Sequence, residues 1–311
     1  MDYFYLIVGI VILLLSGNWL VKSGSALANY FKIPPFIVGV TVISFGTSAP
    51  ELFVSLNASL SGFSDIAIGN VVGSNLANIG LVLAITAIII SIPIQRSTIK
   101  LDYPVLLISA VLFAVFMLDL TISRIEGVIL LSLMLGYILI MIRSVRRDKQ
   151  MKDECTEEKK KNPLLSVLLL IFSCGGLLLG SNMLVEGAGN IAESLGVSQR
   201  IISITVIAFG TSIPELATSV IAAFKKNVDI AVGNIIGSNI FNILVIVGIS
   251  SLANPLSVNP TILKFDMVYM LGMSVLLGIA FIPFKNPKVT RWKGFVFLAA
   301  YFAYYVVLFQ N

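Results

Sequence analysis

The sequence predicts an all-α integral membrane protein of ten transmembrane helices, arranged as two inverted repeats of five helices with a broken helix in each repeat. Three observations predict this class. Apolar residues make up 57% of the 311 positions and charged residues only 12%, at a mean hydropathy of +0.98. Soluble domains carry about 25% charged residues. The other two observations are a series of apolar stretches and an internal duplication.

The apolar stretches are long enough to cross a bilayer, which takes about 20 residues. They lie at roughly 3–21, 33–60, 66–94, 105–120, 125–142, 164–185, 201–224, 230–252, 267–282 and 295–309. We expect the first stretch to remain in the protein as a helix and not to act as a leader. Its flank begins with Asp2, where a secretory leader carries basic residues.

The duplication consists of two motifs that recur in the same order 164 positions later. Val42–Glu51 reads VISFGTSAPE and recurs as VIAFGTSIPE at Val206–Glu215. Gly69–Asn78 reads GNVVGSNLAN and recurs as GNIIGSNIFN at Gly233–Asn242. We therefore expect a first repeat at 1–145 with its motif region at 39–79, a linker at 146–162, and a second repeat at 163–311 with its motif region at 203–243. Five spans per repeat would give the second repeat the opposite orientation, with the substrate site near the midplane.

Basic residues set the expected orientation. With the N-terminus outside, the inner loops collect 18 of the 21 Lys and Arg residues and leave Arg124, Arg200 and Lys264 outside. Cytoplasmic loops carry this excess in membrane proteins. We expect a multi-pass protein of the cell membrane with both termini extracellular and the linker 146–162 cytoplasmic.

The first motif combines a proline and a carboxylate at membrane depth. Pro50 and Pro214 have no amide hydrogen, so each releases a helical carbonyl, which membranes tolerate only where it is buried in protein or faces a cavity. Thr47 and Glu51 share one helical face and Ser48 borders it. The second repeat offers the equivalent side chains, Thr211, Ser212 and Glu215. Carboxylates inside membranes are rare and usually functional.

The second motif adds hydroxyl and amide oxygens. Ser74 and Asn78 are four residues apart on one helical face, as are Ser238 and Asn242. All these donors are oxygen, and the chain has no histidine. Oxygen-only shells suit Ca²⁺ or Na⁺ and disfavour zinc or copper. Two carboxylates would be neutralised by one divalent or two monovalent cations, which indicates an exchanger.

Less specific interpretations account for the remaining residues. Glycines of the second motif, among them Gly69, Gly73 and Gly233, are expected to let helices approach closely. Asn70 and Asn234 are expected to cap or bridge helices. Near a span end, Asp102 is expected to be interfacial. A single membrane proline can also be only a packing kink.

Together, the motifs GTSxPE and GNxxGSNxxN resemble the two alpha repeats of the sodium/calcium exchanger family, within the calcium/cation antiporter superfamily, in its compact prokaryotic form. The resemblance implies that spans two, three, seven and eight hold the ions and that spans one and six form a moving gate. It also implies the ion ligands, which are Thr47, Ser48, Glu51 and the Ser44 carbonyl, Thr211, Ser212, Glu215 and the Ala208 carbonyl, and Ser74, Asn78, Ser238 and Asn242.

The expected function is secondary active exchange of Na⁺ for Ca²⁺ by alternating access, with calcium extruded. Proton coupling and potassium-dependent exchange are alternatives, and an intramembrane hydrolase is a remote one, since paired carboxylates can act as acid and base. The expected partners are the transported Ca²⁺ and Na⁺ ions and the lipid bilayer. We expect no enzyme activity, no cofactor, no nucleic-acid partner and no obligate protein partner.

Overall fold

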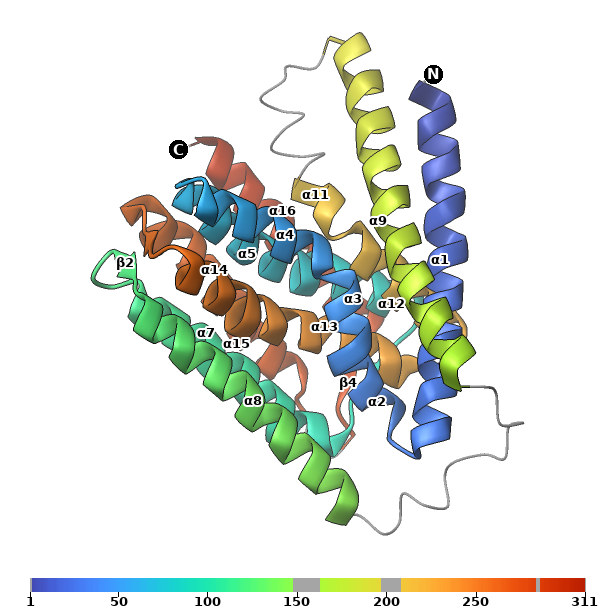
Figure 1. Ribbon diagram of the computed structural model, residues 1–311. Helices are drawn as coiled ribbons and strands as arrows, with labels where there is room; N and C mark the ends of the chain where they lie inside the picture. Colours follow the sequence, from blue (N-terminus) through green and yellow to red (C-terminus); the bar gives the residue numbers. More distant parts are fainter. Residues whose placement is uncertain (1, 148–162, 197–207, 284–285, 311) are drawn as a thin grey trace. The chain divides into compact units, whose positions relative to one another are not determined.

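A computed structural model describes residues 2–147, 163–196, 208–283 and 286–310 (Figure 1). Most of the expected linker and the first part of the stretch 201–224 lie outside these residues. The chain forms two compact units. Unit 1 comprises Met1–Pro50 and Lys149–Asn234, and unit 2 comprises Glu51–Asp148 and Ile235–Asn311. Each unit therefore contains parts of both sequence repeats.

The described residues are almost entirely helical, and η marks π-helical segments. The first repeat contains α1 (Asp2–Phe31), α2 (Pro35–Val38), η1 (Gly39–Ile43), α3 (Ser44–Thr47), α4 (Ala49–Leu60), α5 (Ser64–Ala77), η2 (Asn78–Leu83), α6 (Ala84–Ile89), β1 (Ile92–Pro93), η3 (Thr98–Asp102), α7 (Tyr103–Phe116), β2 (Thr121–Ile122) and α8 (Arg124–Arg147). The second repeat contains α9 (Pro163–Ser194), α11 (Ala208–Thr211), α12 (Ile213–Phe224), α13 (Val228–Phe241), η6 (Asn242–Val247), α14 (Gly248–Ala253), β3 (Leu256–Ser257), η7 (Ile262–Asp266), α15 (Met267–Ala280), β4 (Lys288–Val289) and α16 (Arg291–Gln310).

The duplication extends to the boundaries of these elements. From α3 and α11 to α7 and α15, paired elements begin and end 164 positions apart, and this includes the π-helical pairs η2 and η6, and η3 and η7. The helices α8 and α16 begin 167 positions apart, which reflects three extra residues in the second repeat. The two copies thus encode the same local structure, and their inverted orientation stays a prediction.

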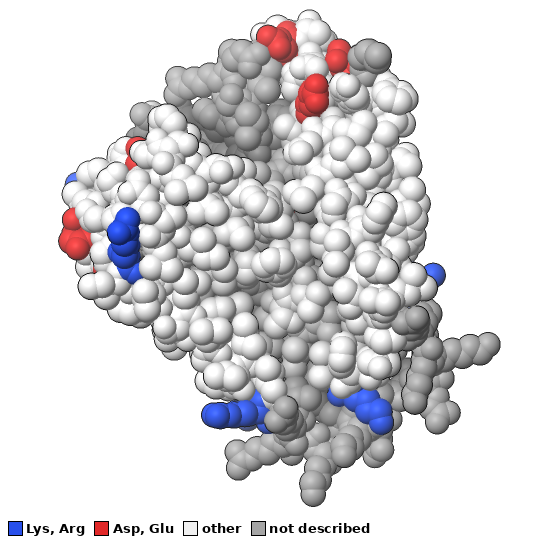
Figure 2. Space-filling view, in the orientation of Figure 1, with Lys and Arg blue, Asp and Glu red and all other residues white. Residues whose placement is uncertain are grey.

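Seven of the described helices are long and apolar enough to cross a membrane, and an eighth span results if the bent pair Pro35–Thr47 and Ala49–Leu60 is counted as one. The expected seventh and tenth spans correspond to the shorter α12 and to α16, which fall outside this set. Figure 2 shows that uncharged residues cover most of the described surface on the visible face. The chain is a multi-pass membrane protein, and the number ten stays a prediction.

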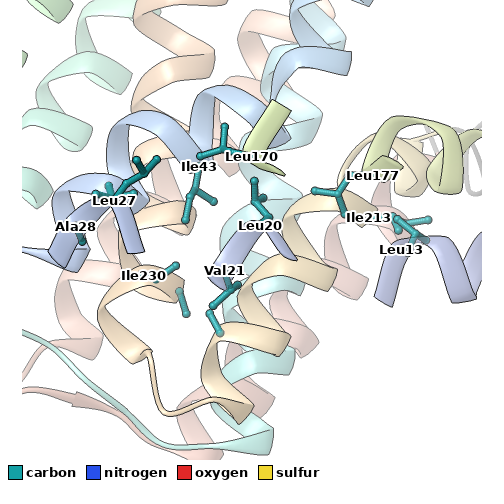
Figure 3. Packing of buried hydrophobic residues seen from close by; sticks show 13 residues of the cluster. Leu13, Leu20, Val21, Leu27, Ala28, Ile43, Leu170, Leu177, Ile213 and Ile230 are labelled. Carbon is teal, nitrogen blue, oxygen red and sulfur yellow. The ribbon is translucent and has the colours of Figure 1, made fainter. Parts of the chain in front are cut away.

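Unit 1 is built on the pair α1 and α9, which lie side by side (Figure 1). Glycines permit this contact, because a Cβ atom on Gly9 would lie 2.8 Å from the backbone nitrogen of Leu184. Such close approach is typical of helix pairs in membranes. The apolar core of the unit, shown in Figure 3, joins side chains of these two helices to Ile43, Ile213 and Ile230.

Unit 2 joins elements of the two repeats in a reciprocal way. The helix α8 of the first repeat packs on η6 and α14 of the second, and α16 packs on η2 and α6. Two short antiparallel sheets follow the same rule. Strand β1 pairs with β4, with Ile92 opposite Val289, and β2 pairs with β3, with Thr121 opposite Ser257.

Two tyrosine–aspartate pairs also repeat within unit 2, of which the first is buried and the second is partly buried. The Tyr137 hydroxyl donates to Asp102 Oδ1 at 2.7 Å, and the Tyr304 hydroxyl donates to Asp266 Oδ1 at 2.8 Å. Asp102 is only 2% exposed. The expected position of Asp102 at the membrane interface stays a prediction, while within the protein the tyrosine hydroxyl replaces the water that an exposed carboxylate would bind.

We expect Tyr137→Phe to destabilise the protein by about 1–3 kcal/mol, because it removes a hydrogen-bond donor from a buried carboxyl group. The measurement is thermal unfolding of the purified protein in detergent. Tyr30→Phe, at a tyrosine that is 46% exposed, is the control. Equal melting temperatures for the two variants would contradict the stabilising role of the pair.

Candidate functional site

The predicted helix breaks are present in both repeats. Between α3 and α4 the chain leaves the helix at Ser48, with φ −89° and ψ 10°, and the equivalent Ser212 has φ −88° and ψ 1°. Pro50 and Pro214 lie in the first turn of the helix that follows, where a missing amide hydrogen costs no hydrogen bond. In the first repeat the axis bends by 49°. The near-identical dihedral angles indicate that each motif encodes its own break.

One of the carbonyls released near the breaks is already bonded within the protein. The Gly210 carbonyl accepts a hydrogen bond of 2.6 Å from the Ser181 hydroxyl of α9. The first repeat has Gly17 at the position equivalent to Ser181, so it has no side chain for this role. Sequence reasoning missed Ser181, because nothing in its local pattern distinguishes it from other small residues of α9.

The first motif of one repeat contacts the carboxylate of the other within unit 1. The Ser48 hydroxyl donates to Glu215 Oε1 at 2.8 Å. Ser48 is 0% exposed and Glu215 is 1% exposed. A carboxylate in such a place requires hydrogen-bonding partners or a cation, since isolated burial of a charge is costly. The structure thus brings together two of the predicted site residues from the two repeats.

A close helix crossing in unit 1 places the same motif against α13. A Cβ atom on Gly233 would lie 2.5 Å from the Phe36 carbonyl oxygen and 3.1 Å from Gly39 Cα. At this crossing the Ser44 hydroxyl lies 3.0 Å from the Asn234 carbonyl, next to a shorter contact of 2.8 Å with the Gly39 carbonyl, and the Thr47 hydroxyl donates to Asn234 Oδ1 at 3.1 Å. The expected close approach is therefore confirmed at Gly233.

Gly69, the first-repeat equivalent of Gly233, behaves differently. Among the described residues, no atom lies within 4 Å of a Cβ placed on Gly69 or on Gly73. The expectation of close approach is wrong at these two positions, because the same motif meets different neighbours in the two repeats.

In unit 2 the backbone of Glu51 is bonded by an asparagine of its own repeat. Asn70 Nδ2 donates to the Glu51 carbonyl at 3.1 Å and to Ser55 Oγ at 2.9 Å. The equivalent bond in unit 1 joins Asn234 Nδ2 to Ser219 Oγ at 3.1 Å. Both asparagines bridge helices, as predicted. Glu51 itself is 1% exposed.

Several predicted site residues carry buried polar atoms that no described residue satisfies. Within the described parts of the chain, no hydrogen-bond partner reaches the side-chain oxygens of Ser212, Ser238, Asn78 and Asn242. Buried polar atoms are nearly always bonded, so each exception requires an explanation. Asn78 and Asn242 also begin the π-helical segments η2 and η6, and such segments are frequent at functional sites.

The predicted residues are divided between the units. Unit 1 contains Ser44, Thr47, Ser48, Ala208, Thr211, Ser212 and Glu215. Unit 2 contains Glu51, Ser74, Asn78, Ser238 and Asn242. Among the described residues, no three His, Cys, Asp or Glu side chains form a metal cluster, so the donor sets consist mainly of hydroxyl and amide oxygens. That all twelve residues share one site stays a prediction.

Comparisons with known proteins agree over nearly the whole chain. Residues 1–143 and 165–310 match the family described as "Sodium/calcium exchanger protein". The chain is 34% identical to the "Putative antiporter CaxA" of Alkalimonas amylolytica, covering 99% of this chain and 98% of that protein. It is 32% identical to "Sodium/calcium exchanger MaX1" of Methanosarcina acetivorans, covering 99% and 98%. A solved structure of the sodium-calcium exchanger NCX_Mj matches with a TM-score of 0.84 at 34% identity, covering 99% and 98%.

We expect Gly233→Ala to destabilise the protein by about 1–3 kcal/mol, because the added methyl group forces two backbones apart. The matched control is Gly69→Ala, at the equivalent position of the first repeat, which has room for a methyl group. Alanine favours helix over glycine, so this control should be neutral or stabilising. Thermal unfolding in detergent measures both variants, and equal effects would contradict the close crossing at Gly233.

Proposed function

We propose that this chain, which belongs to the sodium/calcium exchanger family, exchanges Na⁺ for Ca²⁺ across the membrane by alternating access and expels calcium from the cytoplasm. Family membership rests on the match over residues 1–143 and 165–310. The remaining steps are our inference from the chemistry of the buried polar residues.

The observation that carries this proposal is the set of buried oxygen atoms on predicted ligand residues that lack a partner among the described residues. Serine hydroxyls and asparagine carbonyls are ligands that Ca²⁺ and Na⁺ accept, and they bind softer metals poorly. Glu51 and Glu215, each 1% exposed, supply the negative charge that a cation would compensate. We propose the twelve predicted residues as the ligands of the transported ions.

Exchange follows from the charge of this site. Without a cation, the two carboxylates would carry a net charge of −2 through an apolar environment, at a large desolvation cost. Occupied by one Ca²⁺ or by two Na⁺, the same site is neutral. A ligand shifts a conformational equilibrium only through its differential affinity for the two states. The loaded forms should therefore cross the barrier and the empty form should not, which makes exchange obligatory.

The pair α1 and α9 is the proposed moving gate. These helices correspond to spans one and six, and their glycine contacts allow them to pack closely. We propose both termini on the extracellular side and the linker 146–162 in the cytoplasm, from the distribution of basic residues.

Two rival functions use the same residues. A calcium/proton antiporter would bind protons on Glu51 and Glu215, and a potassium-dependent exchanger would need K⁺ in addition. The family resemblance implies that an aspartate in place of one of the two asparagines goes with potassium use, and this chain has Asn78 and Asn242. We therefore favour an exchanger that couples to sodium and does not require potassium. We also favour transport over enzyme activity.

The decisive experiment is uptake of radioactive calcium into proteoliposomes loaded with sodium and diluted into medium without sodium or potassium, at equal pH on both sides. We expect uptake that disappears when choline replaces the internal sodium. Uptake that requires external potassium, or a pH gradient with sodium irrelevant, would show that the coupling ion is wrong.

We expect Glu51→Gln and Glu215→Gln each to reduce sodium-driven calcium uptake at least about 100-fold, because each removes half of the charge that compensates Ca²⁺. Glu186→Gln, at an exposed carboxylate of α9, is the control and should transport normally. Normal transport by either of the first two variants would contradict the assignment of the site.

A further inference from the structure

We infer that Asn234 is a positioning residue for the cation site, which fixes the direction of the Thr47 hydroxyl proton and so aims the oxygen lone pairs at the transported ion. The inference rests on the proposed function, since it assigns Thr47 as a ligand. Asn234 is not among the predicted ligands. The asparagine, Thr47 and Ser219 are all 0% exposed, so water does not compete for their hydrogen bonds.

The geometry fixes the orientation of the Asn234 amide. Its nitrogen donates to Ser219 Oγ at 3.1 Å, which turns its oxygen toward Thr47. The Thr47 hydroxyl then donates to that oxygen at 3.1 Å. The same hydroxyl lies 3.4 Å from the Ser44 carbonyl, which is a longer and therefore weaker contact. The asparagine is therefore the better acceptor for its single proton.

The direction of this proton matters for cation binding. A hydroxyl group has one proton and two lone pairs, and only a lone pair can coordinate a cation. A proton that points at the ion would repel it. Because Asn234 accepts the hydrogen bond from Thr47, the lone pairs of the Thr47 hydroxyl remain available to the ion. Outer partners of metal ligands commonly have this effect.

The first repeat contains the same internal arrangement. Asn70 donates to Ser55 Oγ at 2.9 Å, and Ser55 and Ser219 each lie four residues after the glutamate of their own motif. In both repeats the amide nitrogen is thus engaged by a serine of the broken helix, which leaves the amide oxygen for another donor. If Asn234 only bridged helices, its amide oxygen would not need to accept a hydrogen bond from the hydroxyl of a predicted ligand.

The test measures equilibrium binding of radioactive calcium to the purified full-length protein in detergent, with thermal unfolding as a check on folding. We expect Asn234→Leu, which has a similar volume and no acceptor, to weaken Ca²⁺ binding roughly 10–100-fold. Asn234→Asp keeps an acceptor oxygen and adds negative charge, so it should bind Ca²⁺ at least as tightly as the wild type. Weakened binding by both variants would overturn the inference.

A double-mutant cycle separates positioning from packing. Thr47→Val removes the hydroxyl, so adding Asn234→Leu to it should weaken binding by less than about twofold more. Multiplicative losses in the double variant would show that Asn234 acts independently of Thr47. Ser219→Ala leaves the asparagine in place and is expected to weaken Ca²⁺ binding less than Asn234→Leu does. It is the substitute test if Asn234→Leu does not fold. Unaltered binding in Ser219→Ala would then count against the inference.

Absence of calcium binding by the wild-type protein would instead contradict the proposed function. If the wild-type protein binds calcium and the Asn234→Leu variant binds it equally well, only the positioning role is contradicted. The two failures can therefore be told apart.

Discussion

The rest of the structure depends on two carboxylates that are almost completely removed from water. Glu51 and Glu215 are each 1% exposed, and burial of a charge is costly unless hydrogen bonds and counter-charges replace its water. The helix break at Ser48 and the buried hydroxyl of that residue help to meet this requirement at Glu215. Ser48 reaches Glu215 because the helix ends at that serine, and Asn70 of α5 donates to the backbone carbonyl of Glu51 in α4.

Much of this could be predicted from the sequence, because it is encoded locally or by repetition. The breaks follow from Pro50 and Pro214, whose rings cannot continue a helix. Helix bridging by Asn70 and Asn234 follows from polar residues in an apolar setting. The duplication predicted equal elements in the two copies, and their boundaries agree at the same spacing of 164 positions.

What could not be predicted depends on contacts between residues distant in the sequence. Tyr137 lies 35 positions from Asp102, and no local pattern connects them. The bond from Ser181 to the Gly210 carbonyl exists in one repeat only, because the other has Gly17 at that position. The spacing of Gly69 and Gly73 indicated a packing surface, yet only a partner helix decides whether a glycine is needed, and Gly233 has one.

The reciprocal sheets bear on the origin of the chain. Strand β1 finds its partner in β4 and β2 finds its partner in β3, so each repeat borrows a strand from the other at both places. A single repeat on its own would leave two short edges unpaired. An ancestral protein of one repeat would therefore have needed a second molecule to complete these pairs. Gene fusion would then have preserved a dimer contact inside one polypeptide, and each copy could afterwards diverge, as Gly17 and Ser181 have done.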